Sequence, residues 1–521
     1  MLTRVLVCAG LLLLVAAAPA RAQDARVIAE RQVKDRVLEL TVATSSFAAP
    51  TKLHVVLPTG YDADPARRWP VTYFTAGTMN RYSAFVNSGG VKLTEDYPSI
   101  VVAPDANSGY WSDWYNAGAF GPPKYETFVI DELLPIIDAR FRTLADREHR
   151  LIFGISMGGY GATMLAARNP DLFSAAATLS GAVDSNLAVL AGVLSVSSTF
   201  DGAPPDAIYG PRATQEVRWR GHNPADLAEN LRGLDLQVRT ASGVPNPGIG
   251  EDPLSADSVS CVVELGVYQA SISLHRTLDG LGIAHTWKDY GPGCHTPPNF
   301  RREIVDTLDH FKRLLAARRP APTTFDVRRV ERAFGVFGWR FEADPGRALE
   351  FLRVTGDADR VTLTGTGRTT VTSPPAYRGL SKVDVGTATV APDADGRVRF
   401  TVDLGPPNTV AEFTRGRTAA APVTRSATLR PHARIVVRTT VVRRGVRVCA
   451  RALGADVRRA RVRLLDARGR RAARSRVVAL NGDELCRRLT RPAGKRRFVV
   501  TVRGRDRFGH EATARKAVRV R

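Results

Sequence analysis

The chain has 521 residues, of which 44% are hydrophobic and 24% are charged. These values are ordinary for a folded protein and exclude collagen-like, heptad-repeat and low-complexity chains. This length exceeds one compact core, so we expect two or three domains. The net charge of +23 is concentrated at one end, because residues 416–521 contain 31 Lys or Arg and only 6 Asp or Glu. The net positive charge is therefore a property of the C-terminal module and not of the whole protein.

The N-terminus has the pattern of a secretory signal. Arg4 precedes an apolar run over residues 5–18, and Ala20-Arg21-Ala22 forms an A-x-A cleavage pattern before Gln23. The apolar run is short for a membrane-spanning helix. We therefore expect residues 1–22 to be a signal peptide and the mature protein to be extracellular or associated with the cell envelope.

The segment over residues 23–318 alternates short β-rich runs with amphipathic segments. This alternation is typical of a mostly parallel sheet that helices cover on both faces. We therefore expect an α/β domain with a doubly wound sheet. Its expected strands are residues 71–76, 99–103, 150–153, 175–179, 234–240 and 284–289, and helical repeats cover residues 125–137 and 304–315.

Two Pro/Ala stretches, residues 319–322 and 419–422, separate the later segments. Residues 323–415 and 426–521 lack helical repeats and show strand runs between Gly, Asp and Pro turns. We expect two smaller β-sandwich-like domains there, the second one basic and immunoglobulin-like. The expected strands are residues 348–354, 360–363 and 398–404 in the first, and residues 435–439, 446–450, 462–465 and 498–502 in the second.

Four cysteines remain after the expected cleavage, and an even number in an oxidising compartment favours disulfides. We expect Cys261 to pair with Cys294 and Cys449 with Cys486, because each pair lies inside one expected domain. The cysteines lack the close Cys/His spacing of a zinc site, and the chain has no P-loop or dinucleotide fingerprint. The sequence therefore predicts neither a metal site nor a cofactor.

The strongest local motif is Gly154-Ile155-Ser156-Met157-Gly158-Gly159, which lies between an expected strand and the helical segment 160–168. In a G-x-S-x-G turn, the glycines leave room for a tight, strained bend that exposes the serine hydroxyl at the carboxyl edge of the sheet. The motif alone is weakly specific, but the strand before it and the helix after it are the context it requires. We therefore predict that Ser156 is a nucleophile.

A nucleophilic serine needs a base, and in this class of fold the chain order is Ser, acid, His. His295 follows the last expected strand in the loop 291–295, where carboxyl-end loops carry catalytic groups. It is therefore the predicted base. The other histidines of this interval lie in a loop, a helix and a strand, at His222, His275 and His285 respectively.

The acid of the triad is expected between the expected strand 234–240 and His295. We favour Glu264, because a disulfide between Cys261 and Cys294 would hold the acid-bearing segment against the base-bearing one. Such a carboxylate orients the imidazole and stabilises its charged form. Asp252 and Asp257 remain alternatives.

Four segments carry a family resemblance, namely residues 110–115, 124–133, 154–159 and 179–181. With them, residues 23–318 resemble the esterase D-like α/β-hydrolases, which include S-formylglutathione hydrolases and feruloyl esterases, and more closely the secreted mycolyltransferase branch. The resemblance implies an α/β-hydrolase fold and a Ser-His-Glu triad, with a glutamate ahead of the histidine where Glu264 falls. It also implies an oxyanion hole built from the backbone N–H groups of Met157 and Thr78.

The chain departs from the mycolyltransferase pattern at two places. Ala76-Gly77-Thr78-Met79 stands where that branch has an Asp-Gly-Leu-Arg run, and residues 296–299 replace its aromatic positions after the base. Trehalose mycolylation is therefore not expected, although acyl-ester chemistry is retained. The cluster of Trp111, Asp113 and Trp114 is a candidate lining for an acyl or sugar site.

The leading expectation is a secreted serine esterase that hydrolyses carboxylic esters through an acyl-enzyme. One alternative is an acyltransferase of mycolyltransferase type that moves an acyl group to a sugar or lipid hydroxyl. Another is a non-catalytic envelope-binding protein on a hydrolase scaffold. The basic C-terminal module is a candidate for binding anionic envelope polymers by electrostatic attraction, and no nucleic-acid partner is expected for an exported chain.

Overall fold

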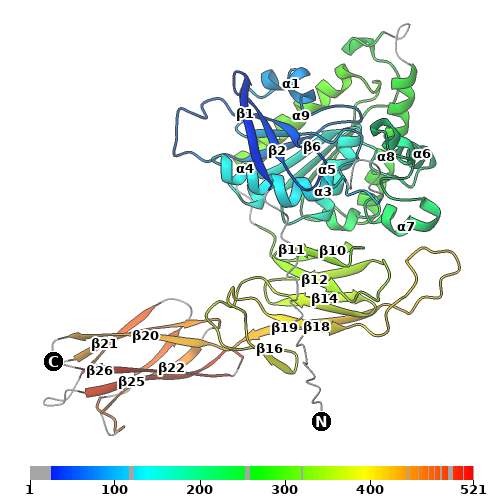
Figure 1. The fold of residues 1–521 in the computed structure, drawn as a ribbon. Coiled ribbons are helices and arrows are strands. Elements are labelled where there is room, and N and C mark those ends of the chain that lie inside the picture. The colour runs from blue at the N-terminus through cyan, green and yellow to red at the C-terminus, as the bar shows by residue number, and fades with distance from the viewer. Residues whose placement is uncertain are drawn as a thin grey trace, which may run out of the picture.

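The computed structural model describes an α/β domain followed by two β modules (Figure 1). The expected signal peptide and Asp257 lie outside the described residues. No helix in the described part of the chain is long and apolar enough to cross a membrane. The described residues are 25–115, 123–252, 258–317, 321–442, 445–455, 457–466, 469–473, 476–480, 484–490, 497–508 and 510–519.

The α/β domain is built on a sheet with the strand order β1-β2-β3-β5-β4-β6-β7-β8-β9. Strands β5, β4, β6, β7, β8 and β9 pair in parallel in that order. Strands β1, β2 and β3 add an antiparallel extension next to β5 that the sequence pattern did not reveal. Their bounds are β1 (Arg26–Lys34), β2 (Val37–Ala43), β3 (Thr51–Val56), β4 (Val71–Thr75), β5 (Ile100–Pro104), β6 (Arg150–Ile155), β7 (Ala175–Leu179), β8 (Asp235–Thr240) and β9 (Thr286–Asp289).

Two hydrophobic clusters cover the two faces of this sheet, because successive side chains of a strand point to opposite faces. On β6, Ile152 packs into the cluster with α4, α5 and α8, while Phe153 packs into the cluster with α1 and α9. The expected doubly wound arrangement is confirmed. The helices are α1 (Ala84–Asn87), α2 (Gly90–Leu93), α3 (Tyr125–Thr127), α4 (Leu134–Arg140), α5 (Met157–Arg168), α6 (Ala188–Ser197), α7 (Arg212–Arg220), α8 (Ser258–Gly280) and α9 (Pro297–Ala316), with a π-helical turn (Phe128–Leu133) between α3 and α4.

The middle module consists of two antiparallel sheets packed around a common core that includes Trp339, Phe341 and Leu363. The expected strand at residues 348–354 begins only at Leu352, because the backbone N–H of Ala348 bonds to the Asn408 carbonyl instead of a neighbouring strand. The strands are β10 (Phe325–Arg329), β11 (Ala333–Val336), β12 (Trp339–Ala343), β13 (Leu352–Gly356), β14 (Arg360–Gly365), β15 (Arg368–Thr372), β16 (Val383–Val385), β17 (Ala388–Val390), β18 (Arg399–Asp403) and β19 (Val423–Pro431).

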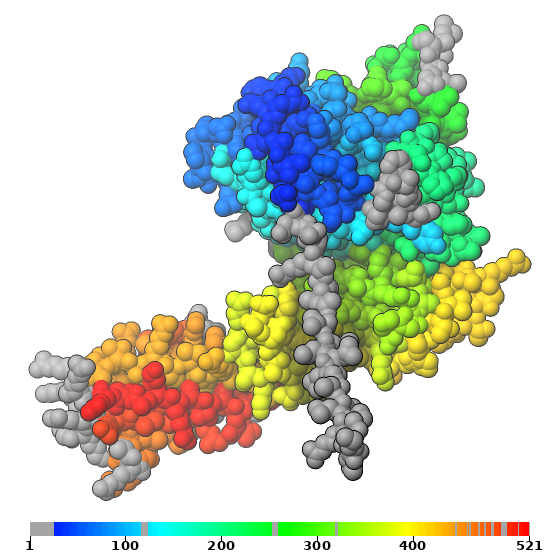
Figure 2. Space-filling model, viewed as in Figure 1, coloured from blue at the N-terminus to red at the C-terminus, as the bar shows by residue number. Residues whose placement is uncertain are grey.

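The C-terminal module has two further antiparallel sheets and extends to one side of the middle module (Figure 2). The Cys449–Cys486 disulfide joins β21 to β24, where the two residues face each other in register. Arg461, Arg463 and Arg503 point outward while their neighbours Val462, Leu464 and Val502 are buried. The strands are β20 (Arg434–Val442), β21 (Gly445–Leu453), β22 (Val457–Asp466), β23 (Arg476–Leu480), β24 (Leu485–Thr490), β25 (Arg497–Asp506) and β26 (Glu511–Arg519).

A buried ion-pair network joins the α/β domain to the middle module. Arg168, at the last turn of α5, contacts Glu126 at 2.9 Å and Glu331 at 2.6 Å, and its side chain is only 3% exposed. Burial opposes the charge of Glu126, but Arg168 and Arg329 outweigh it and lower the pKa of this carboxyl. The middle module therefore docks at the C-terminal end of α5, about 18 Å along the helix from residue Ser156, which precedes its first turn.

Replacement of Arg168 should destabilise the protein strongly. In Arg168→Met, the carboxylate of Glu126 loses its main partner while it stays buried, which costs about 3–5 kcal/mol. We expect the free energy of unfolding to fall by that amount in chemical denaturation. Arg140→Met is the matched control, since the Arg140–Glu30 pair is exposed and should contribute less than about 1 kcal/mol. Equal losses in both variants would contradict a stabilising role for the network.

Candidate functional site

Ser156 lies in a strained turn between β6 and α5. Its backbone has φ of 58° and ψ of −123°, a conformation that non-glycine residues rarely adopt. A Cβ atom at Gly154 or Gly158 would collide with Thr75 on the neighbouring strand β4. Glycine at these two positions therefore permits the close approach that holds the turn in place. Such strain is typical of a nucleophile elbow, and Ser156 is partly exposed.

His295 and Glu264 form a close pair at the same edge of the sheet. His295 Nδ1 lies 2.7 Å from Glu264 Oε2, and the Glu264 side chain is fully buried while that of His295 is 13% exposed. A proton on Nδ1 that is donated to the carboxylate leaves Nε2 as the basic nitrogen. The imidazole is thus held in the tautomer that a general base requires.

The expected disulfide between Cys261 and Cys294 is present, and it positions this pair. Cys261 lies in the first turn of α8, one turn before Glu264, and Cys294 directly precedes His295. The backbone N–H of Cys294 also donates to the carboxylate of Glu251 at 3.0 Å. The loop that carries His295 is therefore tied both to α8 and to the segment before it.

Glu264 has further partners inside the protein. Its Oε1 accepts hydrogen bonds from the Ser180 hydroxyl at 2.6 Å and from the backbone N–H of Ala241 at 2.9 Å. These bonds fix the position of the Glu264 carboxyl group. Ser180 and Ala241 directly follow β7 and β8, so the ends of two parallel strands supply these donors. Asp252, one of the alternatives for the acid, is exposed.

A second buried carboxyl group, Glu303 of α9, lies behind Glu264. Glu303 Oε1 is 3.0 Å from the Ser180 hydroxyl oxygen, and its side chain is fully buried. Burial and the negative charge of Glu264 raise the pKa of Glu303 well above its usual value. A serine hydroxyl has one proton, so Ser180 donates to Glu264 and accepts from a neutral Glu303. The order Glu303, Ser180, Glu264, His295 forms one hydrogen-bonded chain.

The loop after β4 lies against the nucleophile turn. A Cβ atom on Gly77 would lie 3.3 Å from the Ser156 Cβ, so Gly77 and its neighbour Thr78 run beside the serine. Met157 is the first residue of α5, where backbone N–H groups have no partner inside the helix. The backbone of Thr78 and Met157 thus flanks Ser156 from two elements.

The structure gives packing or hydrogen-bond contacts inside the protein to Trp111, Asp113 and Trp114. None of the three lines the cavity that adjoins the Ser156 turn. The indole N–H of Trp111 donates to the Ala76 carbonyl at 3.3 Å, and its ring is fully buried against Gly161. Asp113 accepts from the backbone N–H of Thr127 at 3.0 Å. Trp111 therefore supports the loop after β4 from behind, and the sequence pattern alone did not distinguish packing from substrate contact.

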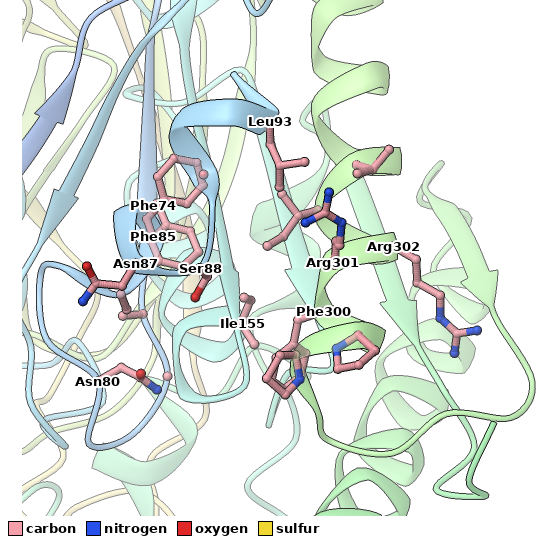
Figure 3. Close-up of a pocket in the computed structure, with 18 of the residues that line it drawn as sticks. Phe74, Asn80, Phe85, Asn87, Ser88, Leu93, Ile155, Phe300, Arg301 and Arg302 are labelled. Carbon is pink, nitrogen blue, oxygen red and sulfur yellow. The ribbon is translucent and has the colours of Figure 1, made fainter. Parts of the chain in front are cut away.

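A cavity of about 980 Å³ adjoins the nucleophile turn. It lies between the loop after β4 and the start of α9, and Ile155, Gly77 and Pro297 line it next to the site. Figure 3 shows Phe74, Phe85 and Leu93 on one side and Phe300 on the other. The walls are mainly apolar, and the polar side chains that line the cavity are Asn80, Asn87, Ser88, Arg301, Arg302 and Asp306.

Two groups of known proteins are similar in sequence to this chain. Esterase Rv1288 of Mycobacterium tuberculosis is 27% identical over 285 residues, which cover 54% of this chain and 60% of that protein. The MPT51 antigen of Mycobacterium leprae is 35% identical over 163 residues, which cover 30% of this chain and 50% of that antigen. The chain thus spans about three fifths of the length of the esterase and half that of the antigen.

Two solved structures also match part of this chain. MPT51 of Mycobacterium tuberculosis is 20% identical with a TM-score of 0.43, and the match covers 53% of this chain and 97% of that one. S-formylglutathione hydrolase from Agrobacterium tumefaciens is 17% identical with a TM-score of 0.42, over 56% and 98% of the two chains. The family described as "Putative esterase" matches residues 44–308, which is just over half of the sequence. The chain therefore belongs to this esterase family.

Proposed function

We propose that the protein is a secreted serine esterase that hydrolyses carboxylic esters through an acyl-enzyme. The observation that carries the proposal is the 2.7 Å contact between His295 Nδ1 and Glu264, at the sheet edge where Ser156 occupies a strained turn. Family membership and the apolar cavity beside the turn support it.

In the proposed reaction, the Ser156 hydroxyl attacks the ester carbonyl while His295 Nε2 accepts its proton. The backbone N–H groups of Thr78 and Met157 stabilise the oxyanion, and Glu264 stabilises the imidazolium. The carbon–oxygen bond to the alcohol then breaks, and His295 returns the proton to the departing alcohol. Water attacks the acyl-enzyme with His295 again as the base, which releases the acid and restores Ser156.

Transfer of the acyl group to a hydroxyl acceptor is the second candidate. It is favoured by similarity to a diacylglycerol acyltransferase/mycolyltransferase, Ag85B of Mycolicibacterium smegmatis, which is 27% identical over 183 residues, 33% of this chain and 52% of that protein. Only the group that resolves the acyl-enzyme differs between the two candidates. Product analysis of one ester, in water with glycerol or a sugar added, separates acid from transferred ester.

The basic C-terminal module supports a proposal about location. Its outward-facing arginines on β22 and β25 form positively charged strand faces that would attract anionic envelope polymers. The arginines that face solvent there include Arg461, Arg463 and Arg503. Attachment of this kind would keep a secreted esterase near the cell surface.

The nucleophile is tested by labelling with a fluorophosphonate probe, which needs no knowledge of the substrate. We expect one probe per parent molecule in intact-mass measurement and none on Ser156→Ala. With an aryl ester, kcat should fall by roughly 10⁴ in Ser156→Ala and His295→Gln, because either change removes the activated nucleophile. His310→Gln is the control, since His310 pairs with Asp235 on another part of the domain. Probe on Ser156→Ala would contradict the assignment.

The cavity predicts a preference for esters with a long or aromatic acyl group. Ser88 is exposed and lines the cavity, so Ser88→Trp should fill part of it without disturbing the core. We expect kcat/KM for a long-chain ester to fall by about tenfold while that for an acetyl ester stays within twofold. Ser83→Trp, on a residue that does not line the cavity, should change neither value. An equal loss for both esters in Ser88→Trp would argue against an acyl site here.

The neutral state of Glu303 beside Ser180 has a signature in stability. The folded state retains its proton above pH 4.5, the usual pKa, where the unfolded chain has lost it. Raising the pH from there therefore destabilises the folded protein by about 1.4 kcal/mol per unit until Glu303 ionises. Glu303→Gln should remove this loss, so its Tm should rise relative to the parent between pH 5 and pH 8. Glu95→Gln at an exposed site should follow the parent, and parallel curves for Glu303→Gln would rule out a neutral Glu303.

A further inference from the structure

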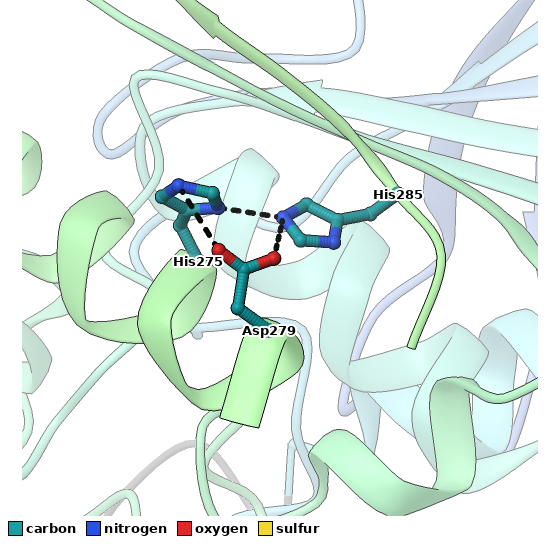
Figure 4. Close-up of side chains that lie close together, drawn as sticks. All are labelled: His275, Asp279 and His285. Atoms are coloured by element: carbon teal, nitrogen blue, oxygen red, sulfur yellow. Dashed lines mark hydrogen bonds and ion pairs between the residues drawn. The ribbon is translucent and has the colours of Figure 1, made fainter. Parts of the chain in front are cut away.

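A cluster of two imidazoles and one carboxylate lies at the end of α8 that is far from Glu264 (Figure 4). His275 and Asp279 are one turn apart on α8, and His285 is the residue just before β9. One donor atom from each of the three residues lies within 4.8 Å of the others. Asp279 is about 22 Å along the helix from Glu264, so the cluster is separate from the candidate active site.

The hydrogen bonds of the cluster favour neutral imidazoles. His285 Nδ1 lies 2.9 Å from the Ile283 carbonyl, so Nδ1 is the protonated nitrogen and Nε2 presents a lone pair to the cluster. His275 Nδ1 lies 2.7 Å from that Nε2 and donates to it. A neutral imidazole whose other N–H is bonded to a backbone carbonyl is the usual arrangement of a metal-binding histidine.

The carboxylate of Asp279 completes the set of donors. Its Oδ2 lies 3.5 Å from His275 Nε2, and its Oδ1 lies 4.0 Å from His285 Nε2. The Asp279 side chain is 61% exposed while that of His285 is 4% exposed, so the cluster opens to solvent on the aspartate side. An ion could therefore enter from solvent without a change in the core.

We propose that His275, Asp279 and His285 bind Zn²⁺ or a similar first-row divalent cation. Two imidazole nitrogens and one carboxylate oxygen suit zinc, whereas Mg²⁺ and Ca²⁺ prefer oxygen ligands alone. Zinc bonds of about 2.0–2.1 Å place neighbouring donors about 3.3 Å apart. The two imidazole nitrogens would separate by less than about 1 Å, His275 would carry its single proton on Nε2, beside Asp279, instead of on Nδ1, and water would occupy the fourth position.

The position of this site suggests what the ion would do. The first turns of α8 carry Cys261 and Glu264, and β9 leads directly into the loop with Cys294 and His295. The disulfide joins these two segments at one end, and the ion would join them at the other. The His275 ring also stacks on Trp287 of β9, with centroids 4.4 Å apart and planes 3° apart, which fixes its orientation. The site is a structural clamp, and it does not depend on the proposed esterase activity.

The test uses the full chain without a polyhistidine tag, freed of metal by a chelator. We expect isothermal titration with ZnCl₂ to show one more bound equivalent in the parent than in Asp279→Asn, or at least tenfold weaker binding at that site in the variant. Zinc should raise the Tm of the parent but not that of Asp279→Asn, because only the folded state presents the three ligands together. CaCl₂ should shift neither.

Two controls keep the result specific. Asp279 is exposed, so Asp279→Asn should have the parent's Tm in chelator, which shows that it folds. His310→Gln alters a histidine with a single carboxylate partner, Asp235, and should bind zinc like the parent. A second group of possible metal ligands is the same in parent and variant, namely Asp384, His432 and His510. Zinc bound there would be equal in the two proteins and would not change the difference in zinc binding between them. Equal zinc binding in parent and Asp279→Asn, or no zinc bound by the parent at micromolar concentrations, would overturn the proposal.

Discussion

The burial of one carboxyl group, that of Glu264, constrains the whole carboxyl edge of the α/β sheet. An ionised carboxylate removed from water costs several kcal/mol unless hydrogen bonds and an opposite charge compensate it. Four elements provide that compensation, through Ser180 after β7, Ala241 after β8, His295 after β9 and, indirectly, Glu303 on α9. The parallel strands end together at this edge, which is why residues distant in sequence can share one carboxylate.

The strained turn of Ser156 depends on the same edge. The positive φ of Ser156 is tolerated because Gly154 and Gly158 let the turn pack directly against Thr75, and the backbone amides beside it remain available. The middle β module attaches through Arg168 at the other end of α5. That attachment leaves the serine and the adjoining cavity on a part of the domain that the network does not reach.

Local patterns predicted most strands of the parallel sheet and both disulfides correctly, because buried parallel strands are continuous apolar runs and each cysteine pair lies in one domain. The antiparallel strands β1 to β3 were missed, since β1 is mostly exposed and polar residues such as Glu39 and His54 interrupt the apolar ones in β2 and β3. Glu303 was also missed. It lies on the buried face of α9 with Asn299 and Thr307, and a single acid at such helical spacing does not reveal which carboxylate it meets.

The sequence by itself determined the nucleophile motif, the order of Ser156, Glu264 and His295, and the change from an α/β segment to β-rich segments. These features follow from short-range spacing, which sequence reports directly. The expected boundary between the two β modules differs from the structure, because β19 (Val423–Pro431) pairs with β14 and β16 of the middle module. Only the tertiary structure decided that Glu264 contacts His295, that Trp111 and Asp113 serve packing and hydrogen bonding, and that His275, Asp279 and His285 converge. Each of these depends on how helices and strands far apart in the chain pack on one sheet, and no local pattern encodes that geometry.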